Sequence, residues 1–234
     1  AVAADAYKHI GKDWVTVILI GPAHKVPVGG AAIWARGSFA TPLGEIEVDE
    51  VLAQKLLGSS KLIEDSSIPH ANEHSLEVQL PFLQRTLGNF KIVPLLVSIT
   101  DLKKCRELGE AIATVIQGQK VLIVISSDLS HYPDRDTARK IDKSTLDAIN
   151  YMDPEYIQRI SRQIMSEQSG LNTTMCGQGA LLTGLFAAKM LGANQAVVQD
   201  YANSGDTPNG DPNRVVGYSA VAFVKGSSPA PAAP

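Results

Sequence analysis

The pattern of apolar and polar positions first indicates three buried strands. Residues 14–20, 90–97 and 120–126 are rich in apolar and β-branched side chains and show no alternation with polar ones. A strand that is apolar on both sides is typical of a parallel sheet covered by helices. We therefore expect these segments to lie at the centre of such a sheet.

Helical periodicity predicts the elements between these strands. Apolar residues recur at helical spacing from Leu102 to Ile116, with charged residues between them, which predicts a surface helix with one apolar face. Residues 176–191 are apolar almost all round, which indicates a central helix. The end of a helix is expected at 1–10, and other helices at 49–57, 74–87, 135–151 and 153–165, with Asp49 as a cap and Pro81 as a kink.

Shorter segments complete the predicted fold. Residues 31–36 and 44–48 are expected to form short strands in a hairpin-like excursion, and 195–201 and 215–224 to close the sheet. Alternating strands and helices predict an α/β sandwich of a single domain, with a mixed, largely parallel central sheet covered by helices. We expect this domain to span residues 1–225, followed by a disordered Pro/Ala tail at 226–234.

Composition narrows the function classes. The 234 residues are 44% hydrophobic and 19% charged, with a net charge of −3, which argues against a nucleic-acid binder and against recruitment to anionic membranes. Two cysteines are too few for a disulfide framework and favour a reducing compartment. We find no signal peptide, and the longest apolar stretch is broken by Lys189, so a cytoplasmic location is expected.

Potential metal ligands follow the predicted strands and precede the predicted helices. His24 comes four residues after Ile20, and Asp128 and His131 come just after the strand that ends at Ser126. Since ligands bind beyond the carboxyl ends of strands in open α/β sheets, these side chains are expected at one edge. His74 lies where a loop becomes a helix. Cys176 lies at a helix start, where the helix dipole favours thiolate.

Structural interpretations of these residues remain open at this point. His24 and His74 could be a loop residue and a helix-start residue, and Cys176 could be a small buried hydrophobe. Asp128 and His131 could simply meet on one turn. Cys105 is predicted to be a buried hydrophobe, whereas His9 and His70 are interpreted as surface residues. The ligand candidates are far apart in sequence, so their shared position at strand and helix ends carries the argument.

Several segments together resemble the MEMO family, known as system protein B of AmmeMemoRadiSam. They are Gly21-Pro-Ala-His24, Glu73-His-Ser-Leu-Glu77, Ser126-Ser-Asp-Leu-Ser-His131, Cys176-Gly177, Tyr201-Ala-Asn-Ser-Gly-Asp206 and Gly217-Tyr-Ser-Ala220. That family is similar to the LigB-type class III extradiol dioxygenases, which use non-haem Fe(II). The resemblance implies that His24, His74 and Cys176 are metal ligands and that Asp128 and His131 are an adjacent polar pair. It also implies AMMECR1-like and radical-SAM proteins as partners.

Two departures from the family pattern modify this expectation. An N-terminal strand with a Pro-His-Ala-Gly-Tyr motif is not found in this sequence. In addition, Cys176 stands where the dioxygenases have a carboxylate, and a softer thiolate also suits Zn or Cu.

Three functions follow as hypotheses. The first is an Fe(II)-dependent, dioxygenase-like oxidoreductase in which His131 is the catalytic acid/base and Asp128 fixes its tautomer. The second is a zinc-dependent hydrolase that uses the same residues. The third is a non-catalytic scaffold that holds a peptide or a partner protein in the same pocket.

Overall fold

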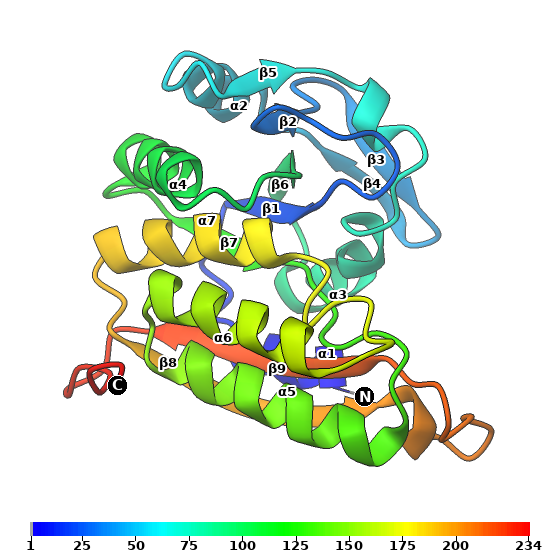
Figure 1. Cartoon of the computed structure of the whole chain (residues 1–234). Coiled ribbons are helices and arrows are strands. Elements are labelled where there is room, and N and C mark those ends of the chain that lie inside the picture. Colours follow the sequence, from blue (N-terminus) through cyan, green and yellow to red (C-terminus); the bar gives the residue numbers. More distant parts are fainter. Residues whose placement is uncertain (1) are drawn as a thin grey trace. The chain divides into compact units, whose positions relative to one another are not determined.

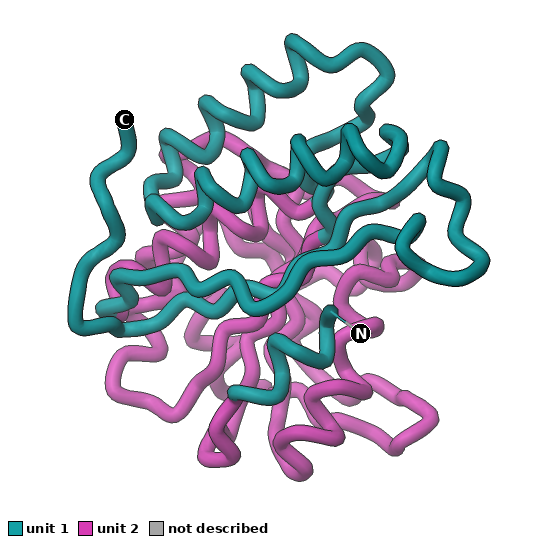
Figure 2. Tube along the Cα trace, turned by 90° about the horizontal axis from the view of Figure 1, so that it is seen from below, with its two compact units in different colours: residues 1–9, 128–176, 192–234 teal, residues 10–127, 177–191 magenta. Residues whose placement is uncertain are grey.

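The chain divides into two compact units, each built from separate stretches of sequence (Figure 2). Unit 1 comprises the residues up to His9 together with 128–176 and 192–234, and unit 2 comprises 10–127 and 177–191. The computed structural model describes residues 2–234, so Ala1, the first residue of a predicted helix, lies outside the described residues. One domain over residues 1–225 stays a prediction.

Unit 2 contains a mixed five-stranded sheet with the order β5-β2-β6-β1-β7 (Figure 1). Neighbouring strands are parallel except β2 and β6, which are antiparallel. The predicted α/β class with a largely parallel central sheet is therefore confirmed. The strands are β1 (Thr16–Pro22), β2 (Ala31–Ile33), β5 (Ile63–Asp65), β6 (Lys91–Val97) and β7 (Val121–Ile125).

The apolar runs behave as predicted at the centre of this sheet. Every residue of β1 is buried, and so is every residue of β6 after Lys91. β7 departs from the prediction, because its residues are only half-buried. Its place at the edge of the sheet, with a partner strand on one side only, accounts for the difference.

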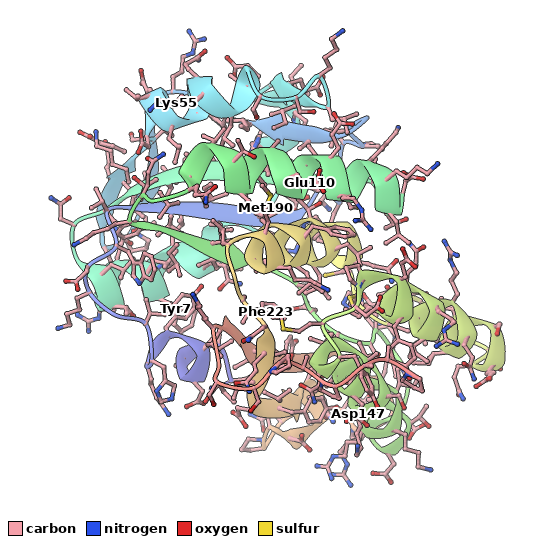
Figure 3. The ribbon with its side chains drawn as sticks, turned by 90° about the vertical axis from the view of Figure 1, so that its left-hand side faces the viewer. Tyr7, Lys55, Glu110, Asp147, Met190 and Phe223 are labelled. Atoms are coloured by element: carbon pink, nitrogen blue, oxygen red, sulfur yellow. The ribbon has the colours of Figure 1, made fainter. Side chains whose placement is uncertain are left out.

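Four helices belong to unit 2: α2 (Glu50–Leu57), α3 (Leu80–Leu87), α4 (Leu102–Ile116) and α7 (Gln178–Met190). The central position predicted for α7 is confirmed, since it packs on β1, β6, β7 and α4 and is buried from Gly179 to Ala187. Its last two residues, Lys189 and Met190, are exposed, and Met190 is labelled in Figure 3. The Asp49 carboxylate caps α2 by accepting a hydrogen bond from the Leu52 amide, as predicted.

Two local predictions in unit 2 were wrong. The hairpin is formed by β3 (Ser38–Thr41) and β4 (Gly44–Glu47), whereas Ala31–Ile33 pairs within the main sheet. Pro81 does not kink a helix that starts at His74. It lies in the first turn of α3, where a proline costs no hydrogen bond, and a short 3₁₀ turn (Glu77–Gln79) precedes it.

The described residues of unit 1 form three α-helices, a short 3₁₀ helix (Ser204–Asp206) and a two-stranded antiparallel sheet. The helices are α1 (Val2–Tyr7), α5 (Arg135–Asn150) and α6 (Pro154–Glu167), and the strands are β8 (Gln195–Asn203) and β9 (Gly217–Val224). The expectation that the last two strands close the central sheet was wrong. They pair with each other instead, and α1 and α5 pack against them.

The last residues of the chain, which belong to unit 1, are held by Asn194. The Asn194 side chain brackets Gly226, accepting a hydrogen bond from its amide at 2.7 Å and donating one to its carbonyl at 3.1 Å. Further on, the Ala230 amide donates to the Asn194 carbonyl. Disorder of residues 226–234 stays a prediction. In the described part of the chain, no helix combines the length and apolarity needed to cross a bilayer.

Candidate functional site

His24, Glu73 and His74 form a cluster in unit 2, called here the His24 cluster. Their ligand-type atoms all lie within 4.8 Å of one another. His24 follows the end of β1, and the loop that carries Glu73 and His74 is tied to that strand end by a hydrogen bond from Ser75 Oγ to the Pro22 carbonyl. The approach is close at Gly21, where an added Cβ would lie 2.7 Å from Leu76 Cδ2.

The Glu73 carboxylate is the fixed point of this cluster. Its side chain is 2% exposed. One oxygen accepts hydrogen bonds from the amides of His74 and Ser75, and the other accepts one from the amide of His24 at 2.5 Å. Burial alone would raise the pKa of Glu73, but these hydrogen bonds and the His24 ring lower it to about 2. The carboxylate is therefore ionised at neutral pH.

Both imidazole rings direct the same nitrogen toward this carboxylate. Nδ1 of His24 lies 3.0 Å from Glu73 Oε1, and Nδ1 of His74 lies 3.3 Å from it. The rings are stacked, with centroids 5.2 Å apart and an interplanar angle of 17°. An ionised carboxylate favours the proton on Nδ1, which leaves Nε2 of each ring as a metal ligand. This donor set fits a divalent transition metal.

Asp128, His131 and Cys176 form a second cluster, within unit 1, called here the His131 cluster. Their ligand-type atoms also lie within 4.8 Å of one another. The Asp128 amide donates to Cys176 Sγ at 3.2 Å, and the Cys176 amide donates back to the Asp128 carbonyl. The His131 amide donates to the Thr173 carbonyl. Backbone hydrogen bonds therefore hold the two segments of this cluster together.

The charge of His131 is set by its neighbours. Its Nε2 lies 3.8 Å from Asp128 Oδ2. The Asp128 carboxylate, followed by the Cys176 sulfur, raises the pKa of His131 to about 9. The ring is therefore protonated at neutral pH and can donate a proton as a general acid. Burial and then the Asp128 charge raise the pKa of Tyr218 as well.

A buried carboxylate supports the His131 cluster. Asp142, on α5, is fully buried, and it accepts hydrogen bonds from the Ser130 amide at 2.9 Å and the Tyr201 hydroxyl at 2.8 Å. Burial raises the pKa of this carboxyl. The carboxylate also lies against Gly217, where an added Cβ would overlap it. Asp142 thereby fixes the backbone next to His131.

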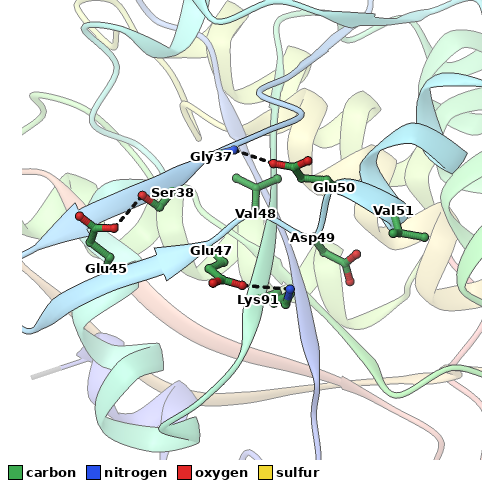
Figure 4. A pocket seen from close by; sticks show the side chains of 9 residues that line it. All are labelled: Gly37, Ser38, Glu45, Glu47, Val48, Asp49, Glu50, Val51 and Lys91. Atoms are coloured by element: carbon green, nitrogen blue, oxygen red, sulfur yellow. Dashed lines mark hydrogen bonds and ion pairs between the residues drawn. The ribbon is translucent and has the colours of Figure 1, made fainter.

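A hollow of about 490 Å³ in unit 2 is lined by none of the predicted site residues (Figure 4). Its acidic side chains already have partners. Glu45 contacts the Ser38 hydroxyl, Glu47 pairs with Lys91 at 3.0 Å, and Glu50 accepts from the Gly37 amide. This arrangement is typical of a charged surface and not of a ligand site.

Comparison with known proteins places the chain in a family. The model of the Memo-like protein family matches residues 1–222. The chain belongs to the Memo-like proteins. A MEMO1 family protein from Methanopyrus kandleri, MK0963, is 36% identical over 230 residues, covering 96% of this chain and 78% of that protein. Another from Methanosarcina barkeri, Mbar_A1422, is 38% identical, covering 94% and 80%.

A solved structure supports the fold of this Memo-like chain. The uncharacterized protein JW3007 from Escherichia coli K12 aligns with a TM-score of 0.59 at 12% sequence identity, covering 92% of this chain and 90% of that one. Such a low identity supports the fold alone. The predicted resemblance to the MEMO family is thus confirmed.

The structure groups the predicted site residues of this Memo-like protein in two sets. It brings His24 and His74 together in unit 2, and Asp128, His131 and Cys176 together in unit 1. Each set contains residues that could hold a metal ion. The ligand set of His24, His74 and Cys176 takes residues from both units and stays a prediction. Cys176 itself precedes α7, whose first helical residue is Gln178 and whose N-cap is Gly177.

Sequence reasoning missed two functional candidates and misplaced one histidine. Glu73 was given no role, although its position directly before His74 in a loop could have indicated one. Nothing in the sequence around Asp142 indicated a role for that residue. His70 is not a surface residue. It is buried, and its Nε2 lies 3.1 Å from the Ala32 carbonyl. The prediction for Cys105 is confirmed, since its side chain is buried on α4, and this burial raises its pKa to about 11.

Proposed function

We propose that this protein is an Fe(II)-dependent, dioxygenase-like oxidoreductase in which His24 and His74 bind the metal. The supporting observation is the pair of imidazoles that share one buried, ionised carboxylate. Such a carboxylate fixes the ring tautomer and raises ligand basicity, as outer-shell groups do in metalloproteins. Glu73 is an orienting group, because both of its oxygens already accept backbone hydrogen bonds.

The roles of the unit 1 residues complete this proposal. Cys176 is the third ligand of the predicted set, and its thiolate donates more charge than a carboxylate does. His131 is the general acid/base, and the Asp128 carboxylate, 3.8 Å from its Nε2, keeps it protonated. Bound iron would supply redox chemistry and open positions for a chelating substrate and oxygen.

Metal analysis is the decisive test. Protein purified without added metal and without oxygen is analysed for Fe, Zn and Cu, alongside His24→Ala and His74→Ala. His9→Ala serves as the matched control, because His9 is exposed and belongs to neither cluster. We expect iron in wild type and the control and its loss in both cluster variants. Metal retained by the cluster variants would overturn the proposal.

Activity and spectroscopy then separate the alternatives. Oxygen uptake by the iron-loaded protein over a panel of chelating substrates supports the oxidoreductase. A zinc-dependent hydrolase is the second candidate, favoured by the thiol of Cys176, and it would predict hydrolysis that persists without oxygen. X-ray absorption tests the third ligand, since a thiolate gives a sulfur scatterer at about 2.3 Å from zinc that Cys176→Ala removes.

The remaining proposals concern partners. AMMECR1-like and radical-SAM proteins are proposed partners on family association, and a scaffold role would use the same residues to hold a peptide. Binding of these proteins to wild type and to His74→Ala is compared in pull-down experiments. If His74→Ala loses the metal but still binds the partners, the metal has a function separate from partner binding. If His74→Ala keeps its fold but no longer binds the partners, the scaffold role is favoured.

A further inference from the structure

A stacked arginine lies next to the His131 cluster in unit 1. The guanidinium carbon of Arg214 lies 3.8 Å from the centroid of the Tyr132 ring, and that ring lies 5.4 Å from the His131 ring. Together these two distances bring the guanidinium to within about 9 Å of the imidazole. A planar cation on an aromatic face keeps a fixed orientation.

The backbone holds this arrangement in place. Tyr132 has a φ of 75°, a left-handed conformation that a bulky residue rarely adopts. The Tyr132 amide donates to the Val215 carbonyl at 2.7 Å, and the Val215 amide donates to the Pro133 carbonyl at 2.9 Å. The tyrosine is therefore fixed beside the residue that follows Arg214. Such strained residues cluster at functional sites.

The charge of Arg214 is available to a ligand. The residue is exposed, and across residues 2–234 no carboxylate forms an ion pair with it. Other arginines of unit 1 differ. Arg139 pairs with Asp206 at 2.6 Å, and Arg159, stacked on Tyr156, donates to the Pro234 carbonyl. A guanidinium without a carboxylate partner can bind a carboxylate through two parallel hydrogen bonds.

We propose that Arg214, held over Tyr132, determines specificity by binding the carboxylate of a ligand whose reacting part lies at the His131 cluster. The Arg214 guanidinium attracts the anionic end of the ligand, which leaves the uncharged reacting end toward His131. This inference rests on the proposed function only in giving His131 its proton-transfer role. The substrate class is therefore a carboxylate whose charged group lies within about 9 Å of its reacting end.

Thiol labelling with a matched pair of reagents tests the proposal without the natural ligand. The probes are 3-maleimidopropionate and its uncharged primary amide, which have the same length and the same reacting group. Metal is first removed with a chelator, and the rate of labelling at Cys176 is measured by peptide mass spectrometry. The buried Cys105 is the internal control for an intact fold.

The quantity compared between proteins is the ratio of the Cys176 labelling rate with the acid to that with the amide. We expect the ratio of acid to amide to fall about fivefold in Arg214→Gln, the effect of one charge at close range in water, and to recover in part in Arg214→Lys. Arg159→Gln removes the same charge from another stacked arginine of unit 1 and should leave the ratio unchanged. The amide rate should be the same in all four proteins, which shows that the cluster is intact.

Two outcomes would overturn the proposal. One is a ratio in wild type equal to that in Arg214→Gln, or a Cys176 thiol that reacts with neither reagent, since a ligand could then not reach the cluster. The other is an equal fall in Arg159→Gln, which would indicate a general charge effect. Neither outcome depends on metal content, so failure of the metal proposal is recognised separately.

Discussion

The Glu73 carboxylate lies against the Nδ1 atoms of both His24 and His74. We predict that Glu73→Gln lowers metal affinity 10- to 100-fold, the usual effect of losing an outer-shell partner of a metal-binding histidine. The amide keeps the size of the side chain but lacks the charge that holds the proton on Nδ1 of His24 and His74. Competition with a chromophoric chelator measures the affinity.

The matched control lies in the same loop. Glu77→Gln makes the same chemical change at an exposed position and should leave metal affinity unchanged. Equal affinities for Glu73→Gln and wild type would show that the carboxylate does not orient the ligands.

Asp142 makes a pH-dependent contribution to stability. Burial raises the pKa of Asp142 in the folded protein, so the folded state holds this proton more tightly than the unfolded state does. The contribution of this proton to the free energy of unfolding is therefore complete below the pKa of Asp142 in the unfolded state, about 3.9, and is lost as the pH rises through its pKa in the folded state. Each tenfold difference in proton affinity between the two states corresponds to about 1.4 kcal/mol. We predict that wild type loses stability relative to Asp142→Asn as the pH rises from about 4 to 7.

Urea unfolding of both proteins across this pH range measures the difference. Asp147→Asn is the control on the same helix, because Asp147 (labelled in Figure 3) is exposed and pairs with Lys143. A difference between wild type and Asp142→Asn that stays constant with pH would contradict the prediction.

The site residues that could be identified from the sequence are marked by local features, whereas those that were missed depend on partners far along the chain. His24, His74 and His131 were found because strand ends and loop motifs are local features. Glu73 and Asp142 act through partners far along the chain: Glu73 binds the His24 amide 49 residues away, and Asp142 binds Tyr201 59 residues away. His70 was misplaced for the same reason, since its buried ring lies against the Ala32 carbonyl, 38 residues away.

At the scale of elements, the contact between α4 and α7 depends on one glycine. An added Cβ at Gly109 would lie 2.6 Å from the Thr183 carbonyl oxygen and 2.6 Å from Phe186 Cβ. We predict that Gly109→Ala destabilises the protein by about 1–3 kcal/mol, because overpacking exceeds the helical preference of alanine. The free energy of unfolding in urea measures the change.

Gly58→Ala is the matched control for this substitution. Gly58 has a φ of −76°, and its nearest contacts would be ordinary ones at 3.7 Å. We expect it to be neutral or slightly stabilising. A Gly109→Ala protein as stable as the Gly58→Ala protein would contradict the close packing of the two helices.

Elements were predictable where a periodic pattern decided them. The apolar face of α4 and the uninterrupted strands β1 and β6 follow directly from spacing. Strand pairing was harder to predict from sequence. The pattern of β8 and β9 is compatible both with strands added to the central sheet and with the separate sheet that they form. The position of Pro81 shows the same limit, since a proline suits a first turn as well as a kink.

At the scale of the whole molecule, each compact unit is built from segments that are not contiguous in sequence. The polypeptide leaves unit 2 after Ser127 and returns at Gly177 to form α7. Sequence predicted the sheet and this central helix but not the division, which depends on contacts between distant segments. Unit 2 therefore needs two segments to complete its core.

This discontinuity leads to a prediction about excised protein. A chain of residues 10–127 alone lacks α7, whose buried residues cover β1, β6 and β7, so it should unfold without cooperativity. Joining residues 127 and 177 by a short glycine linker is geometrically simple, because the Gly177 amide donates to Ser127 Oγ at 2.9 Å. The joined protein should unfold cooperatively.

Urea titration followed by circular dichroism and by the fluorescence of Trp14 and Trp34 distinguishes the two proteins. Coincident, steep transitions are expected for the joined protein and a broad, shallow change for 10–127. A steep transition with the same midpoint in both would show that α7 is dispensable for the sheet. Since the joined protein keeps His24, Glu73 and His74, its metal affinity also measures how much of the binding needs no residue of unit 1.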